Sequence, residues 1–588
     1  MRIIQAKTAG FCMGVKRAVD LALENAAKTE KNILTLGPLI HNSQTVEMLG
    51  QRGIKTLNTT EKLQPKSTLL IRAHGIPPQI QKKYADEGHI IIDGTCPKVK
   101  TVHKVISRYR EMGYSIVITG DKGHAEVIGL LGYAGESGYL IQSIEDVQNL
   151  PSLDKICLVS QTTFDRNQFD RIAEHLKKSF PHADIIIKKT ICSATDQRQS
   201  ETEQLAKQVD ALIVVGGKNS ANTQRLAKIA QDCGTPTQHV ETEEDINWDS
   251  IANCRTIGIT AGASTPIWMI NRVTDYIQFM NHTKKHSIPN TFWHVFDILA
   301  NLNIFVSLGA TAVYYASCYL QSLSFSFLGA VLIFLYFLST YLWNSLASIE
   351  TTQHHGISRY KFYCKHRSLL LSISAASIIL MLALSFLHDK TLFYLLLFAS
   401  LIGSTYHITI VPEYMRKLIR YRSLKDIPSS RDLFVALAWA TVITFVPQIL
   451  NHTWQIEPLN IATFCWIFIL AFFRSLVFDL RDIEGDRIMG RETLITIIGE
   501  KRARKMTFLM ICFSIAALLL FPLLINPISY RSEKTIRFLF QIPSLFYILF
   551  ITKWNPQFNP NHASAFNLLA DGLFFLAALG ALAASAIV

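Results

Sequence analysis

Long apolar segments in the second half of the chain constrain its fold more than any other feature. Each is close to the ~20 residues that cross the hydrocarbon core of a bilayer as a helix. Buried core helices of a large soluble domain are the alternative, but nine such segments follow one another. The sequence therefore predicts about nine transmembrane helices. The segments cover residues 301–321, 324–343, 368–387, 392–411, 432–450, 459–478, 507–526, 536–552 and 565–588.

Basic residues between these segments predict the orientation. They gather after the second, fourth and sixth segments, as at Arg359, Arg416 and Arg481, while the other connections hold few. By the positive-inside rule the basic loops are cytosolic. No signal peptide precedes the first half, which is therefore also expected in the cytosol. We predict a multi-pass protein of the cell inner (cytoplasmic) membrane in contact with lipid. This topology helps to explain the net charge of +13, so no nucleic acid partner is expected.

The first half has a different pattern. Short apolar runs, such as residues 67–71, 115–118 and 211–215, alternate with helical stretches, and this alternation predicts an α/β sheet structure. Ligands of such sheets bind beyond the carboxyl ends of the strands. Polar residues follow the runs there and suit a small phosphorylated ligand. They are His74, His124, Glu126, Thr162, Ser220, Asn222 and Ser264.

Three cysteines also follow strand-like runs. Cys12, Cys96 and Cys192 have no cysteine partner nearby in the sequence. Strands that each end in one thiolate can converge on a metal centre, and three thiolates are one short of the four that saturate a [4Fe–4S] cluster. Such a cluster would leave one iron open to a substrate. Buried free cysteines are the alternative. The absence of paired cysteine spacings fits a reducing compartment.

Six motifs of the first half resemble the LytB/IspH family of 4-hydroxy-3-methylbut-2-enyl diphosphate reductases. The resemblance extends over about residues 1–280. The motifs are GFCMGVKRA at 10–18, GTCP at 94–97, GHAEVIG at 123–129, QTT at 161–163, ICSAT at 191–195 and GASTP at 262–266.

This resemblance implies three α/β units around a central [4Fe–4S] cluster. The implied reaction removes the hydroxyl of (E)-4-hydroxy-3-methylbut-2-enyl diphosphate by reduction and yields isopentenyl and dimethylallyl diphosphates. No flavin or dinucleotide fingerprint accompanies the motifs, so an external donor such as ferredoxin or flavodoxin is expected. By the resemblance, Cys12, Cys96 and Cys192 hold the cluster, Glu126 donates a proton, Thr162 positions the hydroxyl, and His41, His74, His124, Ser220, Asn222 and Ser264 bind the diphosphate.

A second group of chemical residues follows the sixth apolar segment. Asp479, Asp482 and Asp486 are spaced by three and four, which places all three on one face of a helix, where they can hold Mg²⁺. Simple solvation of acidic residues at the edge of a span is the alternative. With Thr493 and Gly499 following, the stretch resembles the second aspartate motif of UbiA-type intramembrane prenyltransferases, over roughly residues 290–588.

The first aspartate motif of that family is altered here. Its pattern falls on five positions of which two, Asn344 and Glu350, match. The three aspartates are replaced by Ser345, Ser348 and Thr352. Two interpretations remain open: a prenyltransferase with an altered Mg²⁺ site and an unknown acceptor, or a non-catalytic prenyl-binding or anchoring domain.

The predicted organisation has two folded parts. An α/β three-unit cluster-binding domain occupies residues 1–280, a polar linker residues 281–291, and an all-α multi-span membrane domain residues 292–588.

Overall fold

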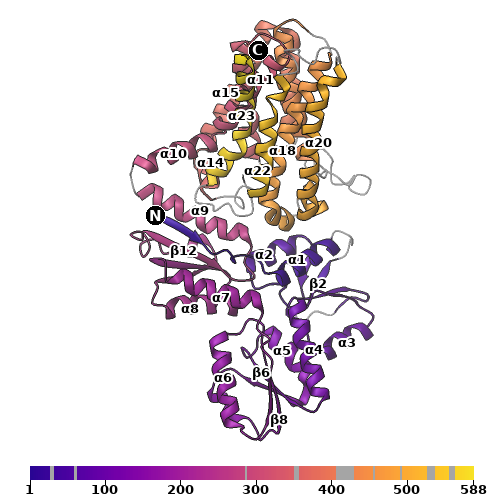
Figure 1. Cartoon of the computed structure of the whole chain (residues 1–588), viewed down its shortest axis with the longest axis vertical. Coiled ribbons are helices and arrows are strands. Elements are labelled where there is room, and N and C mark those ends of the chain that lie inside the picture. The colour runs from indigo at the N-terminus through magenta and orange to yellow at the C-terminus, as the bar shows by residue number, and fades with distance from the viewer. Residues whose placement is uncertain are drawn as a thin grey trace. The chain divides into compact units, whose positions relative to one another are not determined.

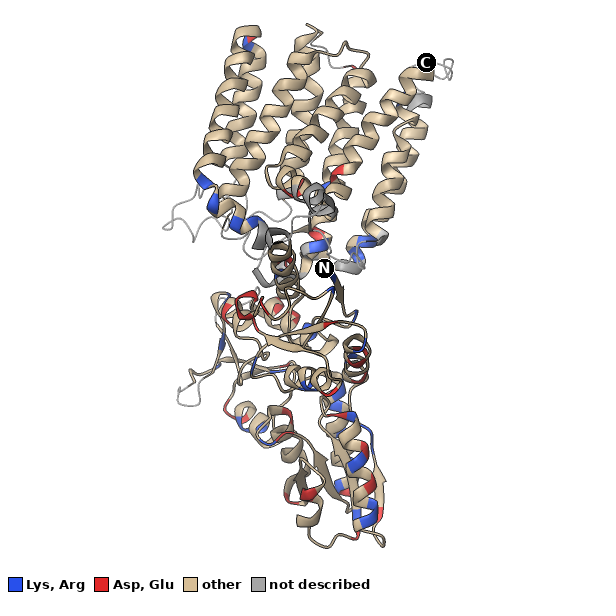
Figure 2. Cartoon of the chain, turned by 90° about the vertical axis from the view of Figure 1, so that its left-hand side faces the viewer, with Lys and Arg blue, Asp and Glu red and all other residues tan. Residues whose placement is uncertain are grey.

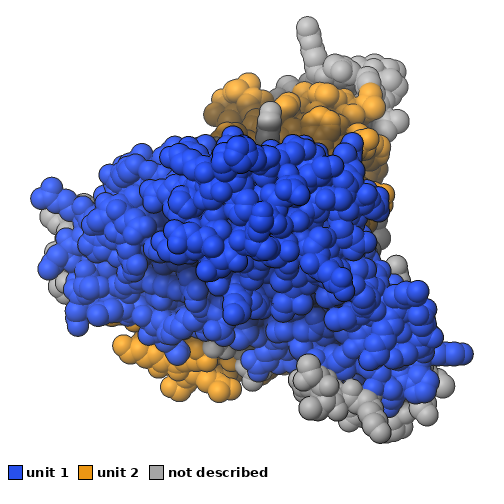
Figure 3. Space-filling model, turned by 90° about the horizontal axis from the view of Figure 1, so that it is seen from below, with its two compact units in different colours: residues 1–274 blue, residues 275–588 orange. Residues whose placement is uncertain are grey.

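A computed structural model of the chain (Figure 1) divides into two compact units, residues 1–274 and 275–588, which Figure 3 colours separately. The structure describes residues 1–26, 32–57, 63–284, 288–347, 349, 357–405, 430–453, 457–489, 493–525, 537–554 and 563–587.

The first unit contains three four-stranded sheets in which all pairs of neighbouring strands are parallel. Their orders are β1-β12-β10-β11, β3-β2-β4-β5 and β7-β6-β8-β9. The predicted α/β fold is therefore confirmed. The strands are β1 (Arg2–Gln5), β2 (Ile33–Thr35), β3 (Ile54–Thr56), β4 (Thr68–Ile71), β5 (Ile90–Asp93), β6 (Ser115–Thr119), β7 (Gly138–Ile141), β8 (Lys155–Ser160), β9 (Asp184–Ile187), β10 (Ala211–Val215), β11 (Thr237–Val240) and β12 (Thr256–Ala261).

Helices connect the strands, because parallel neighbours need a crossover. The central strands are buried and rich in β-branched residues, as in Ile116, Val117 and Ile118 of β6. The helices are α1 (Met13–Ala26), α2 (Ser43–Gln51), α3 (Pro78–Asp86), α4 (Pro97–Glu111), α5 (Ala125–Ala134), α6 (Arg166–Ser179), α7 (Ser193–Ala206), α8 (Ala221–Asp232) and α9 (Ile267–Lys284).

The described part of the second unit is helical throughout apart from its connections. Figure 2 shows that Lys, Arg, Asp and Glu are sparse along most of the helix length. The helices are α10 (Ile288–Asn301), α11 (Ile304–Leu320), α12 (Phe327–Ala347), α14 (Ile357–Lys365), α15 (Arg367–His388), α16 (Lys390–Thr405), α17 (Ser430–Leu450), α18 (Pro458–Met489), α19 (Leu494–Ile498), α20 (Glu500–Ile525), α22 (Ile542–Trp554) and α23 (Ala563–Ile587).

The multi-span membrane fold is supported, but the count of nine spans is not confirmed. In the described residues, six helices are long and apolar enough to cross a membrane, and a pair bent by 72° between residues 295–301 and 304–320 makes up to seven. Two further apolar helices, at residues 390–404 and 537–552, are shorter than a full span. The basic stretch around Arg416 lies outside the described residues.

Helices occupy most of the predicted polar linker. The helix α9 continues to Lys284 and α10 begins at Ile288, so that only residues 285–287 of the linker remain outside the described helices. Pro289 favoured a linker in the sequence. It is the second residue of α10, however, and the first turn of a helix tolerates proline because its N–H groups have no intrahelical partner.

Candidate functional site

The three cysteines occupy equivalent positions in the three sheets of the first unit. Cys12, Cys96 and Cys192 follow β1, β5 and β9 and directly precede α1, α4 and α7. Each backbone N–H donates to a carbonyl two residues beyond the neighbouring strand. These bonds join Cys12 to Ala263, Cys96 to Ala73 and Cys192 to Thr162, at N···O distances of 3.1, 2.9 and 2.9 Å. The repeated bond gives all three thiols the same placement relative to their sheets.

The three cysteines line one cavity. Gly14 lies against two of them: a Cβ there would be 2.5 Å from the Cys96 sulfur and 3.9 Å from the Cys12 sulfur. Burial, with a further contribution from the neighbouring Cys12 and Cys192, raises the pKa of Cys96. Three thiols that directly precede helix N-termini form a soft donor set. This donor set fits an iron–sulfur cluster.

A buried arginine forms a hydrogen bond to the loop that carries Cys12. Arg198 of α7 lies in the cavity wall and is 4% exposed. Its guanidinium donates to the carbonyl oxygens of Gly10, at 3.0 Å, and Ala261. A fixed positive charge therefore stands beside the predicted cluster ligands.

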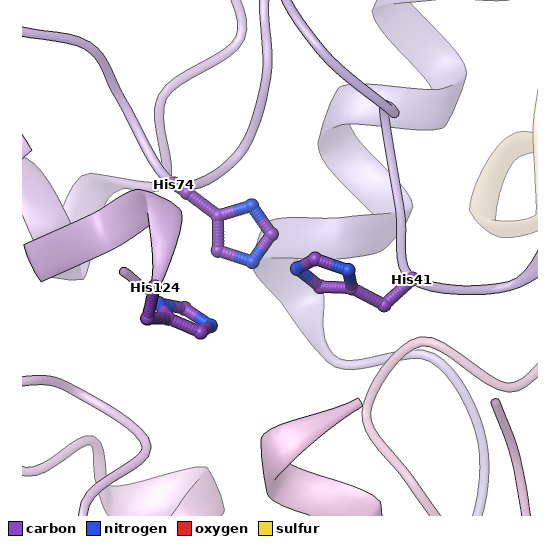
Figure 4. A group of neighbouring side chains, drawn as sticks. All are labelled: His41, His74 and His124. Carbon is purple, nitrogen blue, oxygen red and sulfur yellow. The ribbon is translucent and has the colours of Figure 1, made fainter. Parts of the chain in front are cut away.

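Three histidines form another part of the cavity wall (Figure 4). His41 precedes α2, His74 follows β4, and His124 is the N-cap of α5. The ring centroid of His41 lies 5.0 Å from that of His74 and 5.8 Å from that of His124. The ring centroids of His74 and His124 are 5.3 Å apart. Burial lowers the pKa of all three, that of His124 to about 4. All three rings are therefore neutral at pH 7 in this structure.

The hydrogen bond of His124 fixes which of its nitrogens carries the proton. The Glu126 backbone N–H donates to His124 Nδ1 over 3.2 Å, so the neutral ring carries its proton on Nε2. The ligand nitrogens of the three histidines lie within 4.8 Å of one another, a spacing that also suits a metal ion. The charge of Arg72 indicates whether these histidines suit a metal cation or an anion such as a phosphate group. Its positive charge lowers the pKa of all three histidines, and a charge that disfavours protonation also disfavours a metal cation and favours an anion.

Residues of two further loops complete the polar wall. Ser220 caps α8, and its hydroxyl accepts the Thr223 N–H over 3.4 Å. Asn222 is 7% exposed, and its Nδ2 has no hydrogen-bond partner among the described residues. The Ser264 hydroxyl donates to the His41 carbonyl oxygen over 3.3 Å. The structure therefore brings every predicted diphosphate-binding residue to one cavity.

Glu126 and Thr162 form a pair in the same cavity. Glu126 is 1% exposed, and its carboxylate oxygens accept the Thr162 N–H at 2.7 Å and the Thr162 hydroxyl at 2.8 Å. Burial raises the pKa of Glu126 to about 7, although the two bonds from Thr162 oppose the shift. A carboxyl group with this pKa exchanges a proton readily at neutral pH.

The sequence-based interpretation missed Arg72 and Arg198. Arg72 lies directly beyond β4 and two residues before His74, so the strand-end rule that found the histidine could have found it too. Arg198 lies within α7, in a run of polar residues that reads as a solvated helix. Nothing in that local pattern separates a buried arginine from an exposed one.

The aspartates of the second unit lie on the single helix α18. Asp479 and Asp486 are fully buried, and a separation of seven residues puts them on the same helix face. The side chain of Asp482 lies outside the described residues, as do Ser348, Glu350 and Thr352 of the first motif. A separate cavity of about 230 Å³ is lined by other polar groups, including Arg359, Arg474 and Asp571, and the described lining includes neither Asp479 nor Asp486.

Comparisons with known proteins match each half of the chain separately. Residues 3–278 match the LytB protein family, and residues 364–579 match the UbiA prenyltransferase family. The chain is 40% identical over 280 residues to 4-hydroxy-3-methylbut-2-enyl diphosphate reductase of Clostridioides difficile (strain 630). This alignment covers 47% of this chain and 99% of that protein. The corresponding protein of Aquifex aeolicus (strain VF5) is 39% identical over 279 residues, 47% of this chain and 96% of its own.

Solved structures also align with each half. The structure of (E)-4-hydroxy-3-methyl-but-2-enyl diphosphate reductase is 38% identical, with a TM-score of 0.39, and covers 47% of this chain and 100% of its own. A UbiA homolog from Archaeoglobus fulgidus bound to GPP and Mg²⁺ is 16% identical, with a TM-score of 0.36, and covers 49% of this chain and 98% of its own.

Proposed function

The chain belongs to the LytB protein family, and we propose that its first unit reduces (E)-4-hydroxy-3-methylbut-2-enyl diphosphate to isopentenyl and dimethylallyl diphosphates. The substrate's carbon–oxygen bond breaks, two electrons and two protons are consumed, and the hydroxyl leaves as water. The convergence of three thiols, three histidines and the Glu126–Thr162 pair on one cavity carries this proposal. The domain extends over about residues 1–280.

Cys12, Cys96 and Cys192 would hold a [4Fe–4S] cluster, for which their thiols form a suitable donor set. When bound, such a cluster supplies electron transfer and Lewis-acid chemistry. The electrons enter from an external donor such as ferredoxin or flavodoxin.

Neutral donors bind the diphosphate. His41, His74, His124, Ser220, Asn222 and Ser264 line the cavity, and together they offer N–H and O–H groups to phosphate oxygens. The bound anion then favours the charged form of the histidines, because an opposite charge nearby raises the pKa of an imidazole.

Glu126 supplies the proton that turns the departing hydroxyl into water. Its pKa of about 7 leaves it substantially protonated at neutral pH, and the Thr162 hydroxyl, 2.8 Å from one carboxylate oxygen, lies where it can orient the substrate's hydroxyl.

The full-length chain, purified in detergent without oxygen, provides the test. We expect about four iron and four sulfide per chain and the release of both five-carbon diphosphates on addition of a low-potential reductant. A chain that carries the full iron and sulfide content and binds the substrate but releases neither product would contradict the proposal.

For the second unit we propose a membrane prenyltransferase that binds a prenyl diphosphate, with Asp479, Asp482 and Asp486 holding Mg²⁺. The single helix α18 supports this, since it places Asp479 and Asp486 on one face. The unit lies in the inner membrane, with the reductase unit and the basic loop residues, such as Arg359, on the cytosolic side.

Donor and acceptor screening tests this second function. The change Asp482→Asn should abolish prenyl transfer, and restoring aspartates at Ser348 and Thr352 should lower the Mg²⁺ concentration needed. Prenyl diphosphate binding without transfer to any acceptor, before and after that restoration, would favour the anchoring alternative.

A further inference from the structure

The cavity of the second unit has a net positive wall. Its described lining contains the guanidinium groups of Arg359 and Arg474 but only one carboxylate, that of Asp571. The remaining wall is partly apolar, with Phe305, Val306, Phe478 and Leu568 among its residues. A volume of about 230 Å³ is several times the roughly 30 Å³ that one water occupies in the liquid. The cavity therefore has room for an anionic group beside an apolar chain.

Arg474 of α18 already has its counter-ion within the unit. Its Nε lies 2.6 Å from Asp571 Oδ1 of α23, and the two side chains are only 12% and 6% exposed. Its Nη1 also donates to the Tyr341 hydroxyl over 3.4 Å. The pair is therefore close to neutral as a whole, and Arg359 accounts for the excess positive charge.

The described hydrogen-bond partners of Arg359 are all neutral. Its Nη2 donates to Asn303 Oδ1 at 3.1 Å and to the Ser345 hydroxyl at 3.3 Å. No described carboxylate lies within 4 Å of it, and its buried Nε has no hydrogen-bond partner in the described part of the chain. Because a guanidinium offers five N–H donors, most of them remain available to a ligand.

A break between two helices positions this arginine. Asn303 separates α10 from α11 in a left-handed conformation, with φ of 56°. Its Nδ2 donates to the Tyr363 hydroxyl over 3.0 Å while its Oδ1 accepts from Arg359. The Tyr363 hydroxyl in turn donates to the Asn301 carbonyl oxygen over 2.7 Å. Irregular backbone in a membrane protein is tolerated where it lines a cavity, and here it fixes the amide that holds Arg359.

The hydrogen bond between Arg359 and Ser345 involves a position of the altered first aspartate motif. Ser345 stands where the resemblance places the first aspartate of the first motif, so a hydroxyl bound to a guanidinium replaces a carboxylate that would hold a metal. We propose that Arg359 binds the phosphate oxygens of a prenyl diphosphate directly and takes the place of the metal ion that the first aspartate motif would hold. The inference rests on the proposed binding of a prenyl diphosphate by the second unit. Planar guanidinium groups suit this role because they bind phosphate through two parallel N–H···O bonds.

Binding of geranyl diphosphate to the full-length chain in detergent, in excess EDTA and again in Mg²⁺, tests this inference. In EDTA the wild-type chain should bind the probe, and Arg359→Gln should weaken binding at least about tenfold, as expected for the loss of charged hydrogen bonds. Lys365→Gln is the matched control, since it removes the same charge from an exposed position of the same helix, α14, and should change affinity less than twofold. Reductase turnover, which reports the other unit, should be unchanged in both variants.

Ser345→Asp keeps the test independent of any folding defect in Arg359→Gln. The added carboxylate pairs with Arg359, so binding in EDTA should weaken while a dependence on Mg²⁺ appears. The inference fails if the wild-type chain binds the probe only with Mg²⁺ and Arg359→Gln leaves that affinity unchanged, although the proposed function would then stand. If neither Arg359→Gln nor Asp482→Asn alters binding in either condition, the proposed function of the second unit fails as well.

Discussion

The cavities of the two units provide positive potential for an anion by different means. In the first unit the donors stand at strand ends and helix N-termini, as His124 and Ser220 do, and the histidines are neutral. In the second unit Tyr341, Arg474 and Asp571 come from within long helices whose backbone N–H groups are bonded inside the helix. Helix termini supply partial charges that helix interiors do not. The second cavity therefore relies mainly on the full charge of one side chain, Arg359, whereas in the first cavity the helix N-termini act together with Arg72 and Arg198.

Removal of one of the three thiols should have the largest effect, and it should be confined to the first unit. Cys192→Ser should abolish cluster binding and lower reductase turnover by well over 10²-fold, because even residues that only support a metal ligand cost 10- to 100-fold. Iron and sulfide analysis with a turnover assay measures this. Cys233→Ser, at the partly buried C-cap of α8, is the control and should retain the wild-type cluster content. Full activity in Cys192→Ser would overturn the ligand assignment.

A matching change in the second unit should lower the stability of that unit without affecting the reductase activity of the first. Asp571→Asn leaves Arg474 buried without its counter-ion, which should lower the free energy of unfolding of that unit by about 3–5 kcal/mol. Thermal unfolding of the full chain in detergent measures the loss. Asp389→Asn at the N-cap of α16 is the control, since asparagine caps a helix equally well. Reductase turnover should change less than twofold in both variants, and a large loss in Asp571→Asn would contradict the separation of the units.

Glu126→Gln sharpens the assignment of the proton donor. Glutamine preserves the shape of the side chain but cannot deliver a proton, so kcat should fall roughly 10²-fold while the cluster and substrate affinity remain. Steady-state kinetics and a substrate-binding measurement separate the two effects. A kcat within about threefold of the wild type, well short of that expected loss, would assign the proton to another group.

Gly14→Ala tests how tightly the thiols are placed. The added Cβ would lie 2.5 Å from the Cys96 sulfur, so the sulfur must move. We expect roughly tenfold lower cluster content or turnover, the lower end of the range for disturbed ligand support. Gly50→Ala on α2, where an added Cβ meets nothing within 4 Å, should leave both unchanged.

The smallest expected effect is the pH dependence of wild-type turnover. The pKa of Glu126 is raised to about 7, so its proton-donating form is present below that pH and is lost above it. Between pH 7 and pH 8 the protonated fraction, and with it kcat, should fall roughly fivefold. The profile should lose this step in Glu126→Gln, and an unchanged step there would assign the titration to a different group.

The sequence could predict which residues of the first unit gather around one cavity because they occur in contiguous motifs. Cys12, His124 and Ser264 each follow a strand, and the parallel sheets then bring those strand ends together. The multi-span character of the second unit was also visible from length and hydropathy, although only six to seven of the described helices, not nine, are long and apolar enough to cross a membrane. Its polar cavity was not, since Arg474 and Asp571 are single charges 97 residues apart in apolar helices, and only helix packing makes them partners. The contact of Arg359 with Ser345 depends on the same packing.

The pairing of the first strand with the last determines the earliest time at which the first unit can assemble during synthesis. Ile3 of β1 pairs with Ile257 of β12, and the Cys12 N–H bonds to Ala263, so the Cys12 loop takes its final form only after nearly the whole unit has left the ribosome. At 5–20 residues per second, about 250 residues require roughly 12–50 s. Throughout that interval Cys12 is a nascent-chain thiol without its neighbours. We therefore expect insertion of the proposed cluster to follow synthesis of the unit.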